Sequence, residues 1–78
     1  MNEFAEIEGI GDAGIAGGVA DLLEAAGVGT VADLARRNTL NLHARMITMN
    51  AKQRFVAPTP TLAQVHAWIE SARRRERR

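Results

Sequence analysis

Residues 61–72 read TLAQVHAWIESA, and this stretch decides the fold class of the chain. Its apolar residues recur at i, i+3, i+4 and i+7, which is the spacing of one face of an amphipathic helix. These residues are Val65, Trp68, Ile69 and Ala72. Thr61 and Gln64 fit the S/T-x-x-E/Q capping box that begins many helices. The stretch therefore predicts a helix that follows Thr61, with Trp68 as the central anchor of its buried face.

The chain upstream of this helix shows further helical patterns. Asn38-Thr39 can cap a helix that runs to about residue 50, because apolar residues follow it at helical spacing. Thr30 is a suitable N-cap for a shorter helix before it. Residues 18–26 form another such pattern, and Gly27 fits the left-handed position that closes a helix. No segment shows a convincing alternation of apolar and polar residues, so no sheet is predicted.

The first 18 residues are less regular in pattern. Residues 3–7 are compatible with a short first helix whose acidic side chains suit its N-terminal turn. Residues 9–18, GIGDAGIAGG, contain too many glycines for a regular element, so a compact turn is predicted there. The fold class is therefore all-α, with about five short helices in a compact bundle.

The size of the chain limits what it can do. Its 78 residues make one domain with a thin core, because so short a chain buries only about 60% of its unfolded surface. It contains no Cys, which excludes disulfides and thiolate chemistry. No apolar run approaches the roughly 20 residues that span a bilayer, and the acidic N-terminus does not resemble a signal peptide. We therefore expect a cytoplasmic protein with no membrane contact, no cofactor and no small-molecule substrate.

Charge is divided sharply between the two parts of the chain. Seven of the nine acidic residues lie in residues 1–35, and all ten Lys and Arg residues lie in residues 36–78. The first part therefore carries a net charge of −7 and the second +8, although the whole chain sums to only +1. Such asymmetry indicates an interaction protein, whose partner is nucleic acid, a membrane surface or another copy of the chain. The basic candidates are Arg36, Arg37, Arg45, Lys52, Arg54, Arg73, Arg74, Arg75, Arg77 and Arg78.

Several motifs occur in an order that resembles a helix-hairpin-helix domain. Gly14-Ile15-Ala16 is similar to the tight turn of that motif, and Gly27-Val28 is similar to the A-G-[IV] ending of its second helix. Residues 30–34, TVADL, resemble the T-V-x-D-L segment that often follows. The ordered set covers about residues 7–73 and resembles a bacterial helix-hairpin-helix (SAM-like) family of unknown function. The resemblance implies a single domain over residues 1–73, which leaves residues 74–78 as a basic C-terminal tail.

Two glycine triplets can form the hairpin. Gly9-Ile10-Gly11 has Ile7 in the expected place before it, but it leaves five extra residues before Leu23. Gly14-Ile15-Ala16 needs no insertion, but it has Ala in place of the second Gly. The candidate hairpin residues are therefore Gly9, Ile10, Gly11, Gly14, Ile15, Ala16 and Gly17.

The resemblance implies that the hairpin amides hold a nucleic-acid phosphate, which free N–H donors at a helix N-terminus favour. Here Glu6, Glu8 and Asp12 lie beside the turn, and no cation precedes Arg36. Because cations dominate phosphate affinity, the glycines are better interpreted as a place where two helices cross closely. The basic residues are the better candidates for phosphate contact, although arginines also stabilise helix C-termini and terminal charged runs are often frayed tails.

No catalytic or metal site is predicted. His43, His66 and Ser71 lack neighbours at the spacing of metal ligands or of a catalytic triad. We therefore expect a non-enzymatic module that binds nucleic acid without sequence specificity through its basic C-terminal half. The alternative is a module for protein–protein interaction or head-to-tail self-assembly, in which an acidic face meets a basic face.

Overall fold

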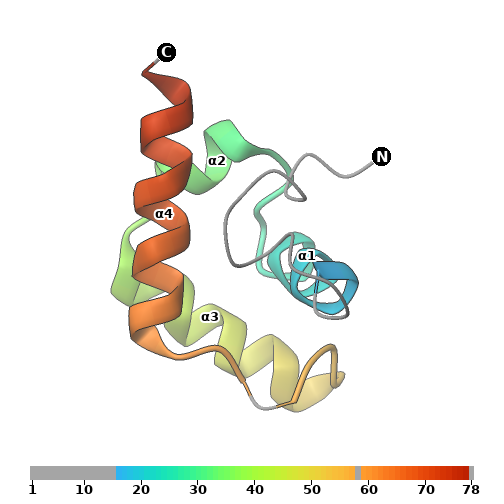
Figure 1. Ribbon diagram of the computed structural model, residues 1–78. Coiled ribbons are helices and arrows are strands. Elements are labelled where there is room, and N and C mark those ends of the chain that lie inside the picture. The colour runs from blue at the N-terminus through green and yellow to red at the C-terminus, as the bar shows by residue number, and fades with distance from the viewer. Residues whose placement is uncertain (1–15, 58, 78) are drawn as a thin grey trace.

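The computed structural model describes residues 16–57 and 59–77, whose regular elements are all helices (Figure 1). The helices are α1 (Ala16–Ala25), α2 (Val31–Ala35), α3 (Thr39–Lys52) and α4 (Leu62–Glu76). No strand occurs in this part of the chain, which confirms the all-helical class. The structure thus describes four helices where about five were expected, and the helix expected over residues 3–7 lies outside the described residues.

The caps predicted from the sequence begin α2 and α3. The Thr30 hydroxyl accepts a hydrogen bond from the backbone N–H of Asp33 at 3.0 Å. The Asn38 side-chain oxygen accepts one from the backbone N–H of Asn41 at 3.1 Å. Each cap satisfies an N–H group that has no partner inside its helix. The two helices therefore start where the sequence predicts them.

A complete capping box begins α4. The Thr61 hydroxyl accepts from the Gln64 backbone N–H at 3.1 Å, and the Gln64 side-chain oxygen accepts from the Thr61 backbone N–H at 2.9 Å. We expect Thr61→Ala to lower the free energy of unfolding by about 1 kcal/mol, measured by chemical denaturation. Thr48→Ala is the control, because Thr48 is exposed in the middle of α3 and bonds only its own helix, at Ala44. Its free energy of unfolding should change by no more than about 0.5 kcal/mol; equal losses in the two variants would contradict the role of the cap.

The start of α1 corrects the last residues of the turn predicted over residues 9–18, of which residues 9–15 lie outside the described part of the chain. The helix begins at Ala16 and therefore includes Gly17 and Gly18. The physical reason is close packing, because a Cβ atom at Gly18 would lie 2.5 Å from the carbonyl oxygen of Phe55. Glycine is needed there for contact between α1 and residues 53–57. At the other end of α1, Gly27 has a φ of 95°, as predicted for a residue that closes a helix.

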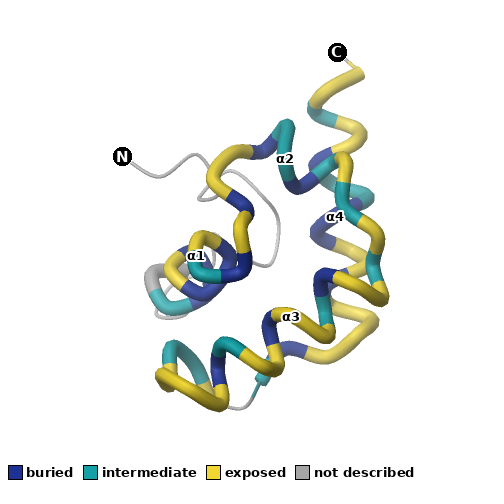
Figure 2. Tube along the Cα trace, turned by 180° about the vertical axis from the view of Figure 1, so that it is seen from behind, coloured by how far each residue is buried: buried dark blue, intermediate teal, exposed yellow. Residues whose placement is uncertain are grey.

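One core joins the four helices. Figure 2 shows buried segments on each of them, and Trp68 is only 4% exposed, as predicted for the central anchor of α4. The helix α4 packs against both α2 and α3, and α1 packs against α3. The largest fully buried side chains are Val19, Leu22, Leu23, Val28, Leu34, Met46, Val65 and Ile69. Aliphatic side chains therefore fill most of the core.

The basic end of the chain is mostly helical in the described residues. The helix α4 continues to Glu76, so it includes Arg74 and Arg75 from the segment expected as a tail. The last buried residue of α4 is Ala72, and Arg74 is exposed. Among the described residues, no helix is both long enough and apolar enough to cross a membrane.

Candidate nucleic-acid interface

Two of the predicted basic residues hold helix ends in place. The Arg37 guanidinium donates from Nη2 to the carbonyl oxygen of Gly27, which follows α1, at 2.6 Å. The Arg73 guanidinium donates from Nε to the carbonyl oxygen of Ala35, the last residue of α2, at 3.1 Å. Carbonyl groups at a helix C-terminus lack donors within the helix, so these arginines supply them. Arg37 and Arg73 therefore have structural roles.

Side chains of α4 itself also hold the guanidinium groups of Arg73 and Arg74 in position. Arg73 donates from Nη1 to Glu70 at 3.1 Å, and Arg74 donates from Nη2 to the hydroxyl of Ser71 at 3.1 Å. The Arg73 and Glu70 side chains are 49% and 36% exposed, so solvent screens this ion pair and it adds little stability. Its effect is mainly to orient the Arg73 guanidinium beside the end of α2.

The bond from Arg73 to Ala35 joins the end of α2, which Arg36 and Arg37 follow, to the part of α4 that carries the other arginines. Arg36 directly follows Ala35, which Arg73 contacts, and Arg77 lies one helical turn after Arg73 on the same side of α4. Arg36, Arg74 and Arg77 are all exposed. We call this group the α2–α4 arginine cluster, which consists of Arg36, Arg37, Arg73, Arg74 and Arg77. Two acidic residues of α4, Glu70 and Glu76, accompany it.

The structure places three other basic candidates elsewhere. Arg45 and Lys52 are on α3, and Arg54 follows it. The 14 residues of α3 span about 21 Å, and Figure 1 shows this helix running away from the C-terminal end of α4. All three side chains are exposed, and no ion pair joins them to a carboxylate within residues 16–57 and 59–77. The basic residues therefore form two separate groups.

The remaining predicted site residues are less informative. Arg75 is half-buried and has a contact of its own. Arg78 and the hairpin candidates from Gly9 to Ile15 lie outside the described residues, so the choice between the two triplets stays a prediction. The last two hairpin candidates, Ala16 and Gly17, are the first residues of α1.

Neither histidine has metal-ligating neighbours at a site among the described residues. In the part of the chain that the structure describes, no three His, Cys, Asp or Glu side chains are placed to hold a metal ion. His43 is half-buried, and its Nε2 atom lies 3.1 Å from the carbonyl oxygen of Pro60, just before α4. His43 therefore connects α3 to the start of α4, and His66 is exposed.

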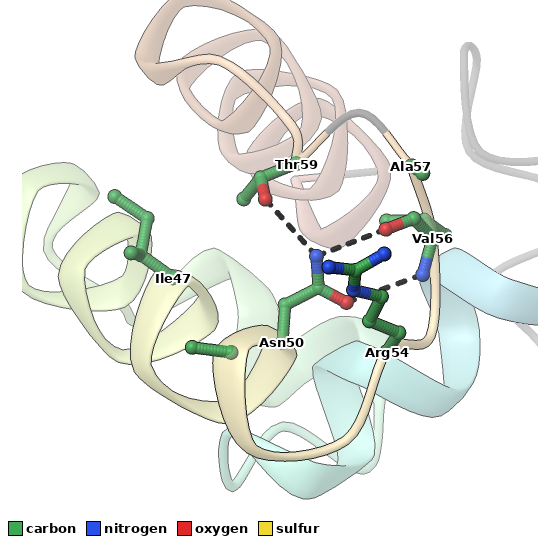
Figure 3. Close-up of a pocket in the computed structure, with 7 residues that line it drawn as sticks. Ile47, Asn50, Arg54, Val56, Ala57 and Thr59 are labelled. Atoms are coloured by element: carbon green, nitrogen blue, oxygen red, sulfur yellow. Dashed lines mark hydrogen bonds between the residues drawn. The ribbon is translucent and has the colours of Figure 1, made fainter.

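Asn50, a buried polar side chain near the end of α3, has a role that was not predicted from the sequence. Its oxygen accepts from the backbone N–H groups of Phe55 and Val56, at 2.8 and 3.2 Å. Its nitrogen donates to the carbonyl oxygen of Val56 at 2.9 Å and to the Thr59 hydroxyl at 3.0 Å (Figure 3). The signal was present in the sequence, because Asn50 continues the i, i+4 series of Leu42 and Met46 and so occupies a core position.

The chain belongs to the family described as "Domain of unknown function (DUF4332)", which matches residues 5–75. The match covers α1, α2 and α3 and all but the last residue of α4. No curated protein and no solved structure matched the chain. The expectation of a family of unknown function is thereby confirmed, and the family description assigns no activity or partner.

Proposed function

We propose that this protein binds nucleic acid without sequence specificity through the α2–α4 arginine cluster, on a body that resembles a helix-hairpin-helix domain. The observation that carries the proposal is that the Arg73–Ala35 bond joins the ends of α2 and α4, where exposed Arg36, Arg74 and Arg77 adjoin the anchored arginines along the chain. Guanidinium groups match the geometry of phosphate oxygens and stay charged at every physiological pH. A group of them therefore suits a phosphate backbone.

The hydrogen bonds of the cluster support phosphate binding, because they fix the positions of two of its guanidinium groups. Arg37 uses one terminal nitrogen for Gly27, and Arg73 uses Nε and one terminal nitrogen for Ala35 and Glu70. Each guanidinium therefore keeps a terminal nitrogen that makes none of these bonds. Because both are already held in place, a phosphate that binds them costs less side-chain entropy than one that binds mobile arginines.

The described surface favours contact with the backbone of a duplex. Trp68 is buried, and Phe55 packs against the core, so neither offers a ring on which bases of a single strand could stack. Binding that depends on phosphate contacts falls steeply with salt. For about four such contacts, the affinity for duplex DNA should fall roughly 100-fold between 50 and 200 mM salt.

A charge-matched pair of variants tests the proposal. The triple variant Arg36→Ala, Arg74→Ala, Arg77→Ala should lose at least about tenfold in affinity at 50 mM salt, with a salt slope that is smaller by about 3. The control triple variant Arg45→Ala, Lys52→Ala, Arg54→Ala removes the same charge from α3 and the residues after it, and should bind nearly as the parent does. Fluorescence anisotropy with two labelled duplexes of unrelated sequence measures both. No binding at low salt, or equal losses in the two variants, would overturn the proposal.

A further inference from the structure

One face of α3 exposes a line of apolar side chains. Leu40 is 65% exposed and Ile47 is 45% exposed, and Ala44 and Ala51 are exposed as well. The spacing i, i+4, i+7 and i+11 places the four residues in one row along the helix. We call this row the α3 apolar stripe. Single exposed apolar residues are ordinary, but a continuous row of them marks an interaction surface.

The stripe ends in a hollow of about 310 Å³ between α3 and the segment that follows it (Figure 3). Ile47 and Ala51 contribute one side of the hollow, and Val56 and Ala57 contribute the other. The volume is at the lower end of the range for ligand pockets, and it accommodates a large apolar side chain. We call the stripe and the hollow together the groove; the hollow is lined by these four apolar residues and by the polar residues Asn50, Arg54 and Thr59.

The groove is held in shape without a partner. The four hydrogen bonds of Asn50 fix the backbone at Phe55 and Val56 and the side chain of Thr59. Behind this segment, Gly18 of α1 lies so close that it leaves no room for a Cβ atom. A binding partner therefore does not have to order the groove, which lowers the cost of binding.

The charge around the groove indicates the chemistry of the partner. Residues 34–69 contain no carboxylate side chain at all. Arg54 lines the hollow, and it is exposed and forms no ion pair in the described residues. Arg45 and Lys52 add two exposed positive charges to the same helix. An approaching acidic surface is therefore attracted by these cations and meets no carboxylate from residues 34–69.

We propose that this groove binds an acidic amphipathic helix of a partner protein. The apolar residues of that helix lie along the α3 apolar stripe, with one of them in the hollow, and a carboxylate next to it pairs with Arg54. This is the helix-in-groove mode of recognition, in which anchors repeat at i, i+3, i+4 and i+7. Two-fold pairing of α3 with α3 of a second copy fits less well, because it brings the same three cations of both copies together.

Two synthetic helical peptides of about 18 residues test the proposal. Both carry Leu at i, i+4, i+7 and i+11; one has Glu beside the Leu residues and the other has Lys. The acidic peptide should bind at least about tenfold more tightly in low salt. Amide shifts in a heteronuclear NMR titration of the full chain should be confined to residues 40–59. Equal affinity for the two peptides, or shifts at the α2–α4 arginine cluster instead, would overturn the proposal.

Substitutions of exposed side chains test whether the peptide binds in the groove or elsewhere on the protein. Ile47→Ser should weaken the acidic peptide at least about tenfold, and Arg54→Glu should reverse the preference in favour of the basic peptide. Leu62→Ser is the matched control, because Leu62 is 40% exposed on α4 and does not line the hollow. Sedimentation without peptide tests whether a second copy of the chain binds in the groove. If the chain self-associates and Ile47→Ser abolishes this, the occupant of the groove is another copy and the proposal of a partner helix is wrong. If duplex DNA shifted the amide signals of residues 40–59, the groove would bind nucleic acid, and this would also contradict the proposal. If the acidic peptide did not bind, the proposal of DNA binding by the α2–α4 arginine cluster would still stand.

Discussion

Replacing Asn50 by Ala is expected to lower the free energy of unfolding by about 3 kcal/mol. The substitution removes four hydrogen bonds at once and leaves the partly buried N–H groups of Phe55 and Val56 without their acceptor. Unsatisfied donors of this kind cost more than the net value of the bonds, because they have lost water as well. The loss is large compared with a total stability of roughly 4–12 kcal/mol for a domain of this size.

Thermal unfolding measures this effect, with Thr59→Val as the control. For a domain of this size, a loss of about 3 kcal/mol lowers the midpoint by roughly 12–24 °C. Thr59→Val keeps the shape of the side chain and removes only the hydroxyl that accepts from Asn50, so it should cost about 1 kcal/mol. If Asn50→Ala cost no more than Thr59→Val, the other three bonds of Asn50 would contribute nothing and the assignment would be wrong.

Gly18→Ala is expected to destabilise the protein by about 2 kcal/mol, although alanine is the better helix former. In an open helix, replacing Gly by Ala stabilises by about 1 kcal/mol. At Gly18 the new Cβ atom would lie 2.5 Å from the Phe55 carbonyl oxygen and 2.7 Å from Cγ1 of Val56. The Val56 side chain can rotate, but the carbonyl belongs to backbone that Asn50 holds in place. Overpacking typically costs about 1–3 kcal/mol, and contact with a fixed carbonyl places Gly18 at the upper end of this range. Subtracting the gain of about 1 kcal/mol in helix propensity leaves the net loss of about 2 kcal/mol.

The control for this prediction is Gly29→Ala, measured in the same denaturation experiment. A Cβ atom at Gly29 would meet only the Asp33 carboxylate, at 3.9 Å, and the backbone there is not left-handed. This variant should change the free energy of unfolding by no more than about 0.5 kcal/mol. Stabilisation by Gly18→Ala would show that α1 and residues 53–57 do not pack as closely as described.

Helix starts could be predicted from the sequence because each depends on a few neighbouring residues. Thr30, Asn38 and Thr61 all cap the helices expected of them, since a cap bonds an N–H group only three positions along. The buried face of α4 could likewise be predicted from the sequence, because its i, i+3, i+4, i+7 spacing is a local pattern. Such short-range signals were sufficient for α2, α3 and α4.

The start of α1 could not be predicted in this way. The helix was expected from about residue 18, and it begins at Ala16. Glycine has low helix propensity, and at Gly18 only the close passage of Phe55 makes so small a residue favourable. The same holds for Asn50, whose partners depend on the path of the residues after α3. Tertiary contacts decided both cases, and they override local propensity.

The candidate interface, too, could be predicted only in part from the sequence. The sequence gathers arginines in its second part, and it indicates a basic interaction surface from charge alone. It does not show that Arg37 and Arg73 are used on carbonyl groups, because Arg73 and Ala35 are 38 residues apart. The separation of Arg45, Lys52 and Arg54 from the α2–α4 arginine cluster likewise depends on the direction in which α3 leaves the end of α2.

The contact between Gly18 and Phe55 also joins two parts of the chain that are synthesised at different times. Every hydrogen bond of Asn50 joins residues no more than nine positions apart, so the turn after α3 closes at little cost in chain entropy. By contrast, α1 depends on this turn, which lies far along the chain. Because synthesis proceeds from the N-terminus, α1 leaves the ribosome well before the backbone on which it packs. The packing of Gly18 on Phe55 can therefore form only after residues 55 and 56 have been made.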